Sequence, residues 1–257
     1  RLSLVLAGQK ADRIPFIPAI YEHKAFLINK SPSEVCQDYD LLIRALEAEY
    51  EIYQADLLVV GIDVYNVEAE ALGASVEYCK TNETPSISRP VLVNRGQVDD
   101  LQIPNPADSG RMPLMIGAGC EIARRIREEV MIWGAMSGPF TLASCLLGRE
   151  NLLLMTIEDP NWVCKLMGFC TKVLMEYEKA WIEAGLGVIV FDSLCSPPMI
   201  SPQVYRRLVM PYHTKLMDYL KKSGSQYCPL IIGGDTTRIG SGLGGWGAHL
   251  LLCDYNA

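Results

Sequence analysis

Five short runs of Val, Ile and Leu recur along the chain, and each stops abruptly at a small or acidic polar residue. The runs cover residues 56–61, 130–135, 187–191, 228–232 and 248–253, and the residues that close them are Asp63, Ser137, Asp192, Asp235 and Asp254. Their hydrophobicity is continuous and does not alternate, which is typical of strands buried on both faces. The pattern therefore predicts five parallel strands.

Helical stretches lie between most of these runs. Parallel strands separated by helices form an α/β sheet or a barrel, and both architectures place ligands beyond the carboxyl ends of the strands. The polar residues that close the runs are therefore candidate site residues.

Three helix starts combine a capping residue with proline in the first turn, where the missing N–H of proline costs nothing. They are Ser31-Pro32, Asp159-Pro160 and Ser201-Pro202, and they predict helices over residues 32–53, 160–184 and 202–222. Glu34 completes a capping box with Ser31. Residues 77–113 are rich in proline and predict an excursion from the sheet. Within or beside it, residues 75–79 could pair as an edge strand, and residues 110–128 predict the returning helix.

The composition narrows the class of protein. A net charge of −7 without a basic run argues against a nucleic-acid-binding surface. Nine cysteines without a C-x-x-C pair favour free thiols in a reducing cytoplasm. No apolar segment approaches the ~20 residues that a membrane helix needs. We therefore expect a cytoplasmic globular protein that binds neither nucleic acid nor a membrane.

The length of the chain bears on its domain organisation. Its 257 residues suffice for one α/β domain, but only five strands are recognisable. An eight-stranded barrel needs three further strand–helix units, each of about 30 residues. We expect residues 1–257 to form a single barrel domain that is truncated after the fifth recognisable strand.

Three motifs follow the predicted strands. Residues 137–144 (Ser-Gly-Pro-Phe-Thr-Leu-Ala-Ser) open a helix whose first N–H groups would face a site. Phe191-Asp192-Ser193 closes the third strand. Residues 233–236 (Gly-Gly-Asp-Thr) follow the fourth, where glycines allow a ligand to approach closely.

Together with residues 11–15 (Ala-Asp-Arg-Ile-Pro), 68–73 (Glu-Ala-Glu-Ala-Leu-Gly) and 103–106 (Ile-Pro-Asn-Pro), these motifs are collinear over nearly the whole chain. In that order and spacing the chain resembles the uroporphyrinogen decarboxylase family, which includes the decarboxylases and related corrinoid and coenzyme M methyltransferases. The resemblance implies a (β/α)8 TIM barrel with its site at the carboxyl ends of the strands.

Two departures from the family pattern help to decide between the decarboxylase and methyltransferase branches of the family. The arginines that bind the substrate carboxylates of the decarboxylases are absent from residues 17–23, which read Ile-Pro-Ala-Ile-Tyr-Glu-His. The methyltransferases usually hold a thiol-activating zinc with an H-x-C pair and a third Cys, and the positions of the pair are Ile231 and Gly233 here. Neither residue binds zinc, so that type of zinc site is not expected and coenzyme M is not the favoured acceptor.

We interpret the chain as a methyltransferase that passes a methyl group between a methyl ether or methylamine and a corrinoid protein. The first alternative is uroporphyrinogen decarboxylase, with Asp63 and Ser193 at that branch's site positions and with the homodimer that it forms. The second is a homologue without catalysis that serves as a binding partner. The corrinoid would be carried by the partner protein.

Demethylation of an ether leaves an alkoxide or phenolate, which a nearby acid would protonate. The candidate acids are Asp63, Asp192 and Asp235, and the candidate substrate-binding residues are His23, Tyr65, Met136, Ser137, Gly138, Phe140, Ser193 and Gly234. No metal is expected, although Glu68, Glu70 and His213 are weak candidates for ligands beside Asp192. The structural alternatives are that Asp192 caps the following loop, that Asp235 shapes a turn and that His213 contacts solvent or backbone.

Overall fold

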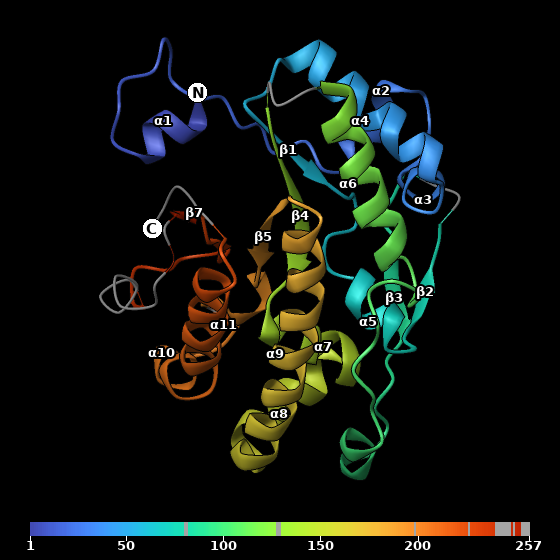
Figure 1. The fold of residues 1–257 in the computed structure, drawn as a ribbon. Helices are drawn as coiled ribbons and strands as arrows, with labels where there is room; N and C mark the ends of the chain where they lie inside the picture. Colours follow the sequence, from blue (N-terminus) through green and yellow to red (C-terminus); the bar gives the residue numbers. More distant parts are fainter. Residues whose placement is uncertain are drawn as a thin grey trace.

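Five parallel strands form one sheet in the order β1-β4-β5-β6-β7 (Figure 1). The computed structural model describes residues 1–79, 82–126, 130–197, 199–225, 227–239, 248 and 250–252. The strands are β1 Leu57–Val60, β4 Met131–Ser137, β5 Gly187–Phe191, β6 Pro229–Ile231 and β7 Leu250–Leu252. Each overlaps one of the five predicted runs, and every neighbouring pair is parallel. The α/β class is confirmed, while Asp254 lies outside the described residues.

The side chains of the sheet point alternately into two apolar layers, which explains why the runs are continuously hydrophobic. In β1, Leu58 and Val60 pack into the large core beneath the outer helices, whereas Leu57 and Val59 pack into a smaller core on the inner face. Strand β5 alternates between the layers in the same way. The strand order follows the chain order, as in a (β/α)8 TIM barrel.

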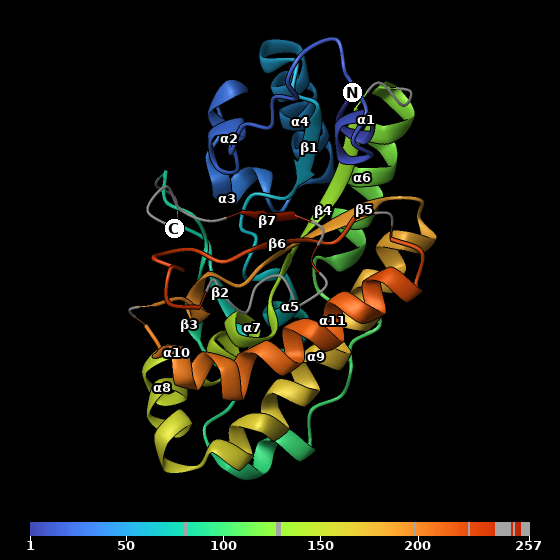
Figure 2. The ribbon, with the colours of Figure 1, turned by 90° about the vertical axis from the view of Figure 1, so that its left-hand side faces the viewer.

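The long helices pack on the outer face of this sheet, and α9 and α11 run side by side there (Figure 2). They are α4 Tyr39–Tyr53, α6 Met112–Ile126, α7 Pro139–Leu147, α8 Arg149–Glu158, α9 Pro160–Glu183 and α11 Met210–Lys222. Shorter helical turns are α1 Leu2–Leu6, α2 His23–Leu27, α3 Pro32–Val35, α5 Val67–Ala71, η1 Arg95–Asp99, η2 Ser193–Cys195 and α10 Pro202–Val204. The predicted starts at Asp159-Pro160 and Ser201-Pro202 are confirmed.

One predicted helix is divided into two. The capping box of Ser31 and Glu34 is present, but the helix that it opens, α3, ends at Val35. Asp38 has extended backbone dihedral angles and accepts a hydrogen bond from the Leu41 N–H at 2.9 Å, so it caps α4 as a new helix. The prediction of one helix over residues 32–53 is wrong because a second capping residue, Asp38, lies within it.

The helical segment after Ser201 contains a π-helical turn, η3 Tyr205–Val209, between α10 and α11. Such a turn holds one residue more than a regular α-helical turn, and it changes which side chains share a face. Tyr205 and His213 consequently both face the buried end of β5.

A two-stranded antiparallel sheet lies apart from the parallel sheet. It consists of β2 Ser75–Glu77 and β3 Ser86–Arg89, which pair with each other and with no other described strand. The predicted strand over residues 75–79 therefore exists, but it is not an edge strand of the main sheet. This hairpin lies beside the carboxyl end of β1.

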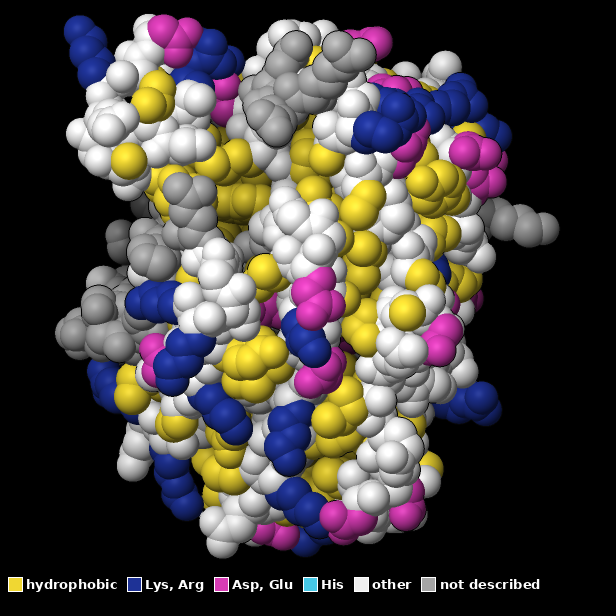
Figure 3. Space-filling view, in the orientation of Figure 1, with side chains coloured by type: hydrophobic (Ala, Val, Ile, Leu, Met, Phe, Trp, Pro, Cys, Tyr) yellow, Lys and Arg dark blue, Asp and Glu magenta, His cyan; other side chains and the backbone are white. Residues whose placement is uncertain are grey.

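The exposed surface of the outer helices mixes charged and apolar side chains (Figure 3). On the face shown in Figure 3, Lys and Arg side chains gather over α9 and α11 and are interspersed with Asp and Glu. Within the described ranges no single helix is long and apolar enough to cross a membrane, and only α7 with α8, bent by 107°, meets the length and composition criteria as a pair.

Candidate functional site

A pocket of about 690 Å³ lies at the carboxyl ends of the strands. Its walls come from the segment after β1, the N-terminal loop, the β2–β3 hairpin, α7 and the ends of β5 and β6. The lining residues are Tyr21, Glu22, Ile62–Asn66, Thr84–Ile87, Pro90, Ser144, Cys145, Gly148, Arg149, Phe191, Leu194 and Ile231. Ser86 and Arg149 are exposed and form part of the rim. This is the side of an α/β fold at which ligands bind.

Three aromatic rings form one wall of the pocket. The rings of Tyr21 and Tyr65 lie edge-to-face with Phe191, at centroid distances of 5.6 and 6.4 Å and interplanar angles of 82° and 88°. The Tyr65 hydroxyl lies 3.0 Å from Ser193 Oγ. Burial raises the pKa of Tyr21 to about 12 and also raises the pKa of Tyr65, so both side chains are neutral phenols at physiological pH.

Few charged side chains line the pocket. Asp63 contributes only backbone atoms, because its side chain is fully buried and directed to Arg111. Arg149 is exposed on the rim. Glu22 is half-buried, accepts a hydrogen bond from the Thr84 hydroxyl at 3.5 Å, and makes no ion pair with any described residue.

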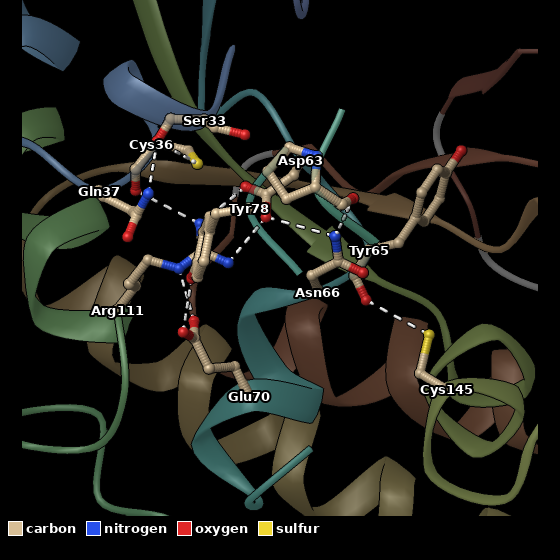
Figure 4. A network of polar contacts seen from close by, with 11 residues as sticks. Ser33, Cys36, Gln37, Asp63, Tyr65, Asn66, Glu70, Tyr78, Arg111 and Cys145 are labelled. Atoms are coloured by element: carbon tan, nitrogen blue, oxygen red, sulfur yellow. Dashed lines mark hydrogen bonds and ion pairs between the residues drawn. The ribbon is translucent and has the colours of Figure 1, made fainter. Parts of the chain in front are cut away.

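Asp63 is the centre of a buried ion-pair network (Figure 4). The Arg111 guanidinium donates two hydrogen bonds to its carboxylate, at 2.9 and 2.7 Å, and the Asn66 amide donates a third at 3.3 Å. Arg111 also donates to Glu70 at 2.5 Å and lies over the Tyr78 ring. A bidentate arginine neutralises the carboxylate, so Asp63 offers no free acid to the pocket.

Glu70 belongs to the same network and not to a metal site. One of its oxygens accepts the hydrogen bond from Arg111, and the other accepts a hydrogen bond from the Tyr78 hydroxyl at 2.6 Å (Figure 4). Through Tyr78, the network joins α5 to the hairpin.

Asp192 is fully buried and caps α7. Its carboxylate accepts hydrogen bonds from the N–H groups of Phe140 and Thr141, at 3.1 and 2.7 Å, and from the Thr141 hydroxyl at 2.7 Å. His213 Nε2 lies 2.7 Å from the same carboxylate, and the Tyr205 hydroxyl lies 2.9 Å from His213 Nδ1. The N–H groups that we expected to face a ligand therefore bind Asp192.

Gly138 allows this close approach. A Cβ atom at this position would lie 2.2 Å from Asp192 Cβ, which is far inside van der Waals contact. Gly138 and the neighbouring candidates Met136, Ser137 and Phe140 are buried and do not line the pocket. Their role in the structure is to seat Asp192 against the start of α7.

The remaining candidates lie in three different places. His23 contacts the Tyr53 hydroxyl at 2.8 Å at the end of α4, and it is not a lining residue of the pocket. Asp235 is exposed and accepts hydrogen bonds from the N–H and hydroxyl of Thr237. Gly234 has a φ of +72° and shapes the same turn. Of the predicted site residues, Asp63, Tyr65 and, through its bond to Tyr65, Ser193 are the ones brought together at the pocket.

Glu68 is a buried acid with an unusual environment. It accepts a hydrogen bond from the Ser137 N–H at 2.8 Å, where β4 extends beyond β1, but its second oxygen has no partner among the described residues. Burial raises the pKa of Glu68 from 4.5 to about 7. Glu68 therefore takes the place of a strand partner for Ser137, and among the described residues it belongs to no group of possible metal ligands.

Glu68→Gln should make the stability of the protein less sensitive to pH. Because the folded-state pKa exceeds the unfolded value of 4.5, the wild type loses stability as pH rises from about 4.5 to about 7. The amide has no such ionisation, so the variant should be more stable than the wild type above pH 7, by on the order of 3 kcal/mol. Urea unfolding at pH 4.5 and at pH 8 measures this difference.

The exposed Glu77→Gln is the matched control for this prediction, and its difference from the wild type should not change with pH. A constant difference between Glu68→Gln and the wild type at both pH values would contradict the assignment.

Comparison with known proteins places this geometry in a family. The model of the uroporphyrinogen decarboxylase (URO-D) family matches residues 1–256. The chain belongs to the URO-D family.

Relatives within the URO-D family carry two kinds of name. The chain is 26% identical to a methylated-thiol–coenzyme M methyltransferase of Methanosarcina mazei, over 93% of this chain and 73% of that protein. It is 27% identical to a uroporphyrinogen decarboxylase of Myxococcus xanthus, over 89% of this chain and 63% of that protein. The solved structure of a methyltransferase from Methanosarcina mazei has the same fold, with a TM-score of 0.87 at 21% identity over 97% of this chain and 74% of that chain.

This member of the URO-D family spans about two thirds of the length of several of these relatives, such as 66% of a methylcobamide:CoM methyltransferase MtbA of Methanosarcina mazei and 63% of the decarboxylase. The similarity confirms the family and the fold. A sequence identity of about 26% does not distinguish methyl transfer from decarboxylation, so the residues of the site must be used for that.

Among the described residues of this URO-D chain, one cluster has the residue types of a metal site. The ligand atoms of Asp192, Cys195 and His213 lie within 4.8 Å of one another. Each is already engaged, because His213 contacts Asp192 directly and the Cys195 thiol donates to the Asp192 carbonyl at 2.8 Å. Burial holds the pKa of Cys195 well above its ordinary value. In the structure the cluster serves to hold Asp192 in place beside α7.

Residues that sequence reasoning missed are Arg111, which neutralises Asp63, and the pocket residues Tyr21 and Glu22. In the stretch 17–23, the sequence directs attention to His23 and to the absence of arginines, and not to Tyr21 or Glu22. A Tyr-Glu pair directly before α2 is the signal that could have pointed to the pocket of this URO-D protein. Arg111 carries no comparable signal, because nothing in the sequence pairs it with Asp63.

Proposed function

We propose that this protein is a methyltransferase that transfers a methyl group between a small methyl donor and a corrinoid carried by a partner protein. The observation that carries the proposal is the character of the pocket wall, which is aromatic and has one cation, Arg149, among its described residues. A tetrapyrrole with eight carboxylates needs several cations to offset the cost of removing them from water. The pocket therefore favours a small donor over uroporphyrinogen.

The chain's own residues provide binding and orientation. Phe191, Tyr21 and Tyr65 offer an apolar wall for a methyl-bearing group, and the Tyr65 and Ser193 hydroxyls offer hydrogen bonds. Holding the methyl carbon at the open side of the pocket reduces the loss of entropy in the transfer step.

The acceptor fits the open side of the pocket. The exposed rim residues Ser86 and Arg149 leave the pocket accessible on the side where the strands end. A reduced corrinoid brought there by a carrier protein would supply the nucleophile for the methyl group. Ile231 and Gly233 occupy the positions of a thiol-activating zinc pair, so a thiol acceptor receives no activation there.

The decarboxylase alternative assigns Asp63 to stabilise a cationic pyrrole intermediate. In the structure this carboxylate already binds Arg111 through two hydrogen bonds. A second positive charge would compete with the guanidinium, which argues against that role.

The proposed function predicts that the protein consumes cob(I)alamin when a methyl donor is present. The experiment mixes the protein anaerobically with cob(I)alamin and a panel of methyl ethers and methylated amines, and follows the cob(I) absorbance. We expect loss of the cob(I) band with at least one donor and not without protein.

Uroporphyrinogen serves as the parallel substrate in the same preparation. Formation of coproporphyrinogen would replace the methyltransferase proposal with the decarboxylase. The absence of reaction in both assays would favour a non-catalytic binding protein.

A further inference from the structure

The three acids predicted from the sequence do not offer a proton to a leaving group in the pocket. Cleaving a methyl ether leaves an oxygen anion, which needs a proton donor close by. Asp63 is paired with Arg111, Asp192 is buried beneath α7 and Asp235 is exposed on a turn. Burial raises the pKa values of the two pocket phenols, Tyr21 and Tyr65, which weakens them as acids. A donor whose leaving group needs no proton suits this site better.

The three aromatic rings form one wall of the pocket. Phe191 is only 2% exposed, whereas Tyr21 and Tyr65 are partly exposed, so the two tyrosine rings are the surfaces that a ligand can reach. Tyr21 and Tyr65 both make edge-to-face pairs with the same ring, Phe191, and all three line the pocket. Aromatic faces attract methylated ammonium ions through their negative electrostatic potential, and this is the known mode of quaternary ammonium recognition.

Glu22 adds a negative charge at the same wall. It directly follows Tyr21 in the chain and is hydrogen-bonded to Thr84 of the hairpin. The other carboxylate among the lining residues, Asp63, is neutralised by Arg111, so Glu22 carries the uncompensated charge of the inner pocket. Arg149 lies on the exposed rim, where water and salt screen its charge.

We propose that the pocket binds a methylated ammonium ion, with its methyl groups against the rings of Tyr21 and Tyr65, which pack on Phe191, and its charge balanced by Glu22. This inference rests on the proposed methyl transfer and names the class of donor. Half-burial of Glu22 beside apolar rings strengthens its attraction for a cation relative to bulk water.

The transfer step then balances without a proton. The bond between the methyl carbon and nitrogen breaks, and its electron pair stays on nitrogen. The new bond to the methyl carbon takes its electron pair from the reduced corrinoid, which is the acceptor. A quaternary ammonium donor leaves as a neutral tertiary amine, so the step needs no proton donor and Glu22 can act as the carboxylate that balances the charge of the donor.

The test is equilibrium binding without any corrinoid, measured by isothermal titration calorimetry. The probes are choline, its neutral carbon isostere 3,3-dimethylbutan-1-ol, and ethanolamine, which has the charge but not the methyl groups. Choline should bind at least about tenfold more tightly than either of the other two, because the isostere lacks the cation and ethanolamine lacks the methyl surface.

Two variants locate the site. Glu22→Gln should weaken choline binding about tenfold while leaving the affinity for the isostere unchanged, because only the charge is removed. Tyr65→Leu should weaken choline binding by a similar factor of about ten through loss of one aromatic face. The control Glu77→Gln makes the same chemical change on exposed β2, outside the pocket, and should bind choline like the wild type.

The proposal is overturned if choline does not bind, if the isostere or ethanolamine binds equally well, or if Glu22→Gln and Glu77→Gln behave alike. Methyl transfer from an ether in the cob(I)alamin assay would in that case still support the proposed function. The failure of the ammonium proposal and the failure of methyl transfer are therefore distinguishable.

Discussion

Asp192→Ala is expected to lower the free energy of unfolding by about 3–5 kcal/mol. The substitution leaves the N–H groups of Phe140 and Thr141, the Thr141 hydroxyl and His213 Nε2 without their acceptor in the interior. Each unsatisfied buried donor costs about 1–3 kcal/mol, and water cannot replace a fully buried carboxylate without rearrangement. Urea unfolding followed by circular dichroism gives the value.

The control for this prediction is Asp38→Ala, which also removes a helix cap. Asp38 is exposed and accepts one hydrogen bond, from the Leu41 N–H, so the expected loss is about 1 kcal/mol. Equal losses for the two variants would mean that Asp192 is an ordinary cap and that the hydrogen bonds to its neighbours are replaced on mutation.

Arg111→Met is expected to cost about 3–5 kcal/mol, because it leaves the Asp63 carboxylate buried without its counterion. Asp63 is fully buried at its side chain, and Arg111 is its only ion-pair partner among the described residues. Glu70 loses the same partner but is partly exposed, so it adds less. Urea unfolding at pH 7 measures the effect.

A double variant separates charge from packing in this network. Asp63→Asn combined with Arg111→Met removes both charges, so it should recover a large part of the stability that Arg111→Met loses. Arg124→Met, which removes an exposed pair with Glu121 on the surface of α6, should leave stability nearly unchanged. No recovery in the double variant would show that Arg111 acts mainly through packing.

The strands could be predicted because each one is buried on both faces and therefore leaves a continuous apolar run. The helix starts at Asp159 and Ser201 could be predicted because proline and a capping oxygen are local signals. The break between α3 and α4 was missed because Ser31 and Asp38 are both good caps, and the sequence does not say which of them opens the longer helix. The hairpin strand β2 was found, but its partner β3 was not.

The site was only partly predictable, for a different reason. The sequence shows directly that polar residues follow the strands, and this pattern points to Asp63 and Asp192. What those carboxylates bind is not local: Arg111 comes from α6 and His213 from α11, and both reach their partners through the tertiary packing. A carboxylate at a strand end therefore looks the same in the sequence whether it is a free acid or a structural anchor.

The β2–β3 hairpin has a consequence for how substrate range could change. It pairs with no strand of the parallel sheet, yet Thr84, Pro85 and Ile87 supply part of the pocket wall. The hairpin is tied to the strand ends by the Asn66 amide on the Pro85 carbonyl and by the Tyr78 hydroxyl on Glu70. A designer could therefore vary Thr84, Pro85 and Ile87 to reshape the pocket without touching the parallel strands, provided that Tyr78, which joins the hairpin to the Asp63 network, is kept.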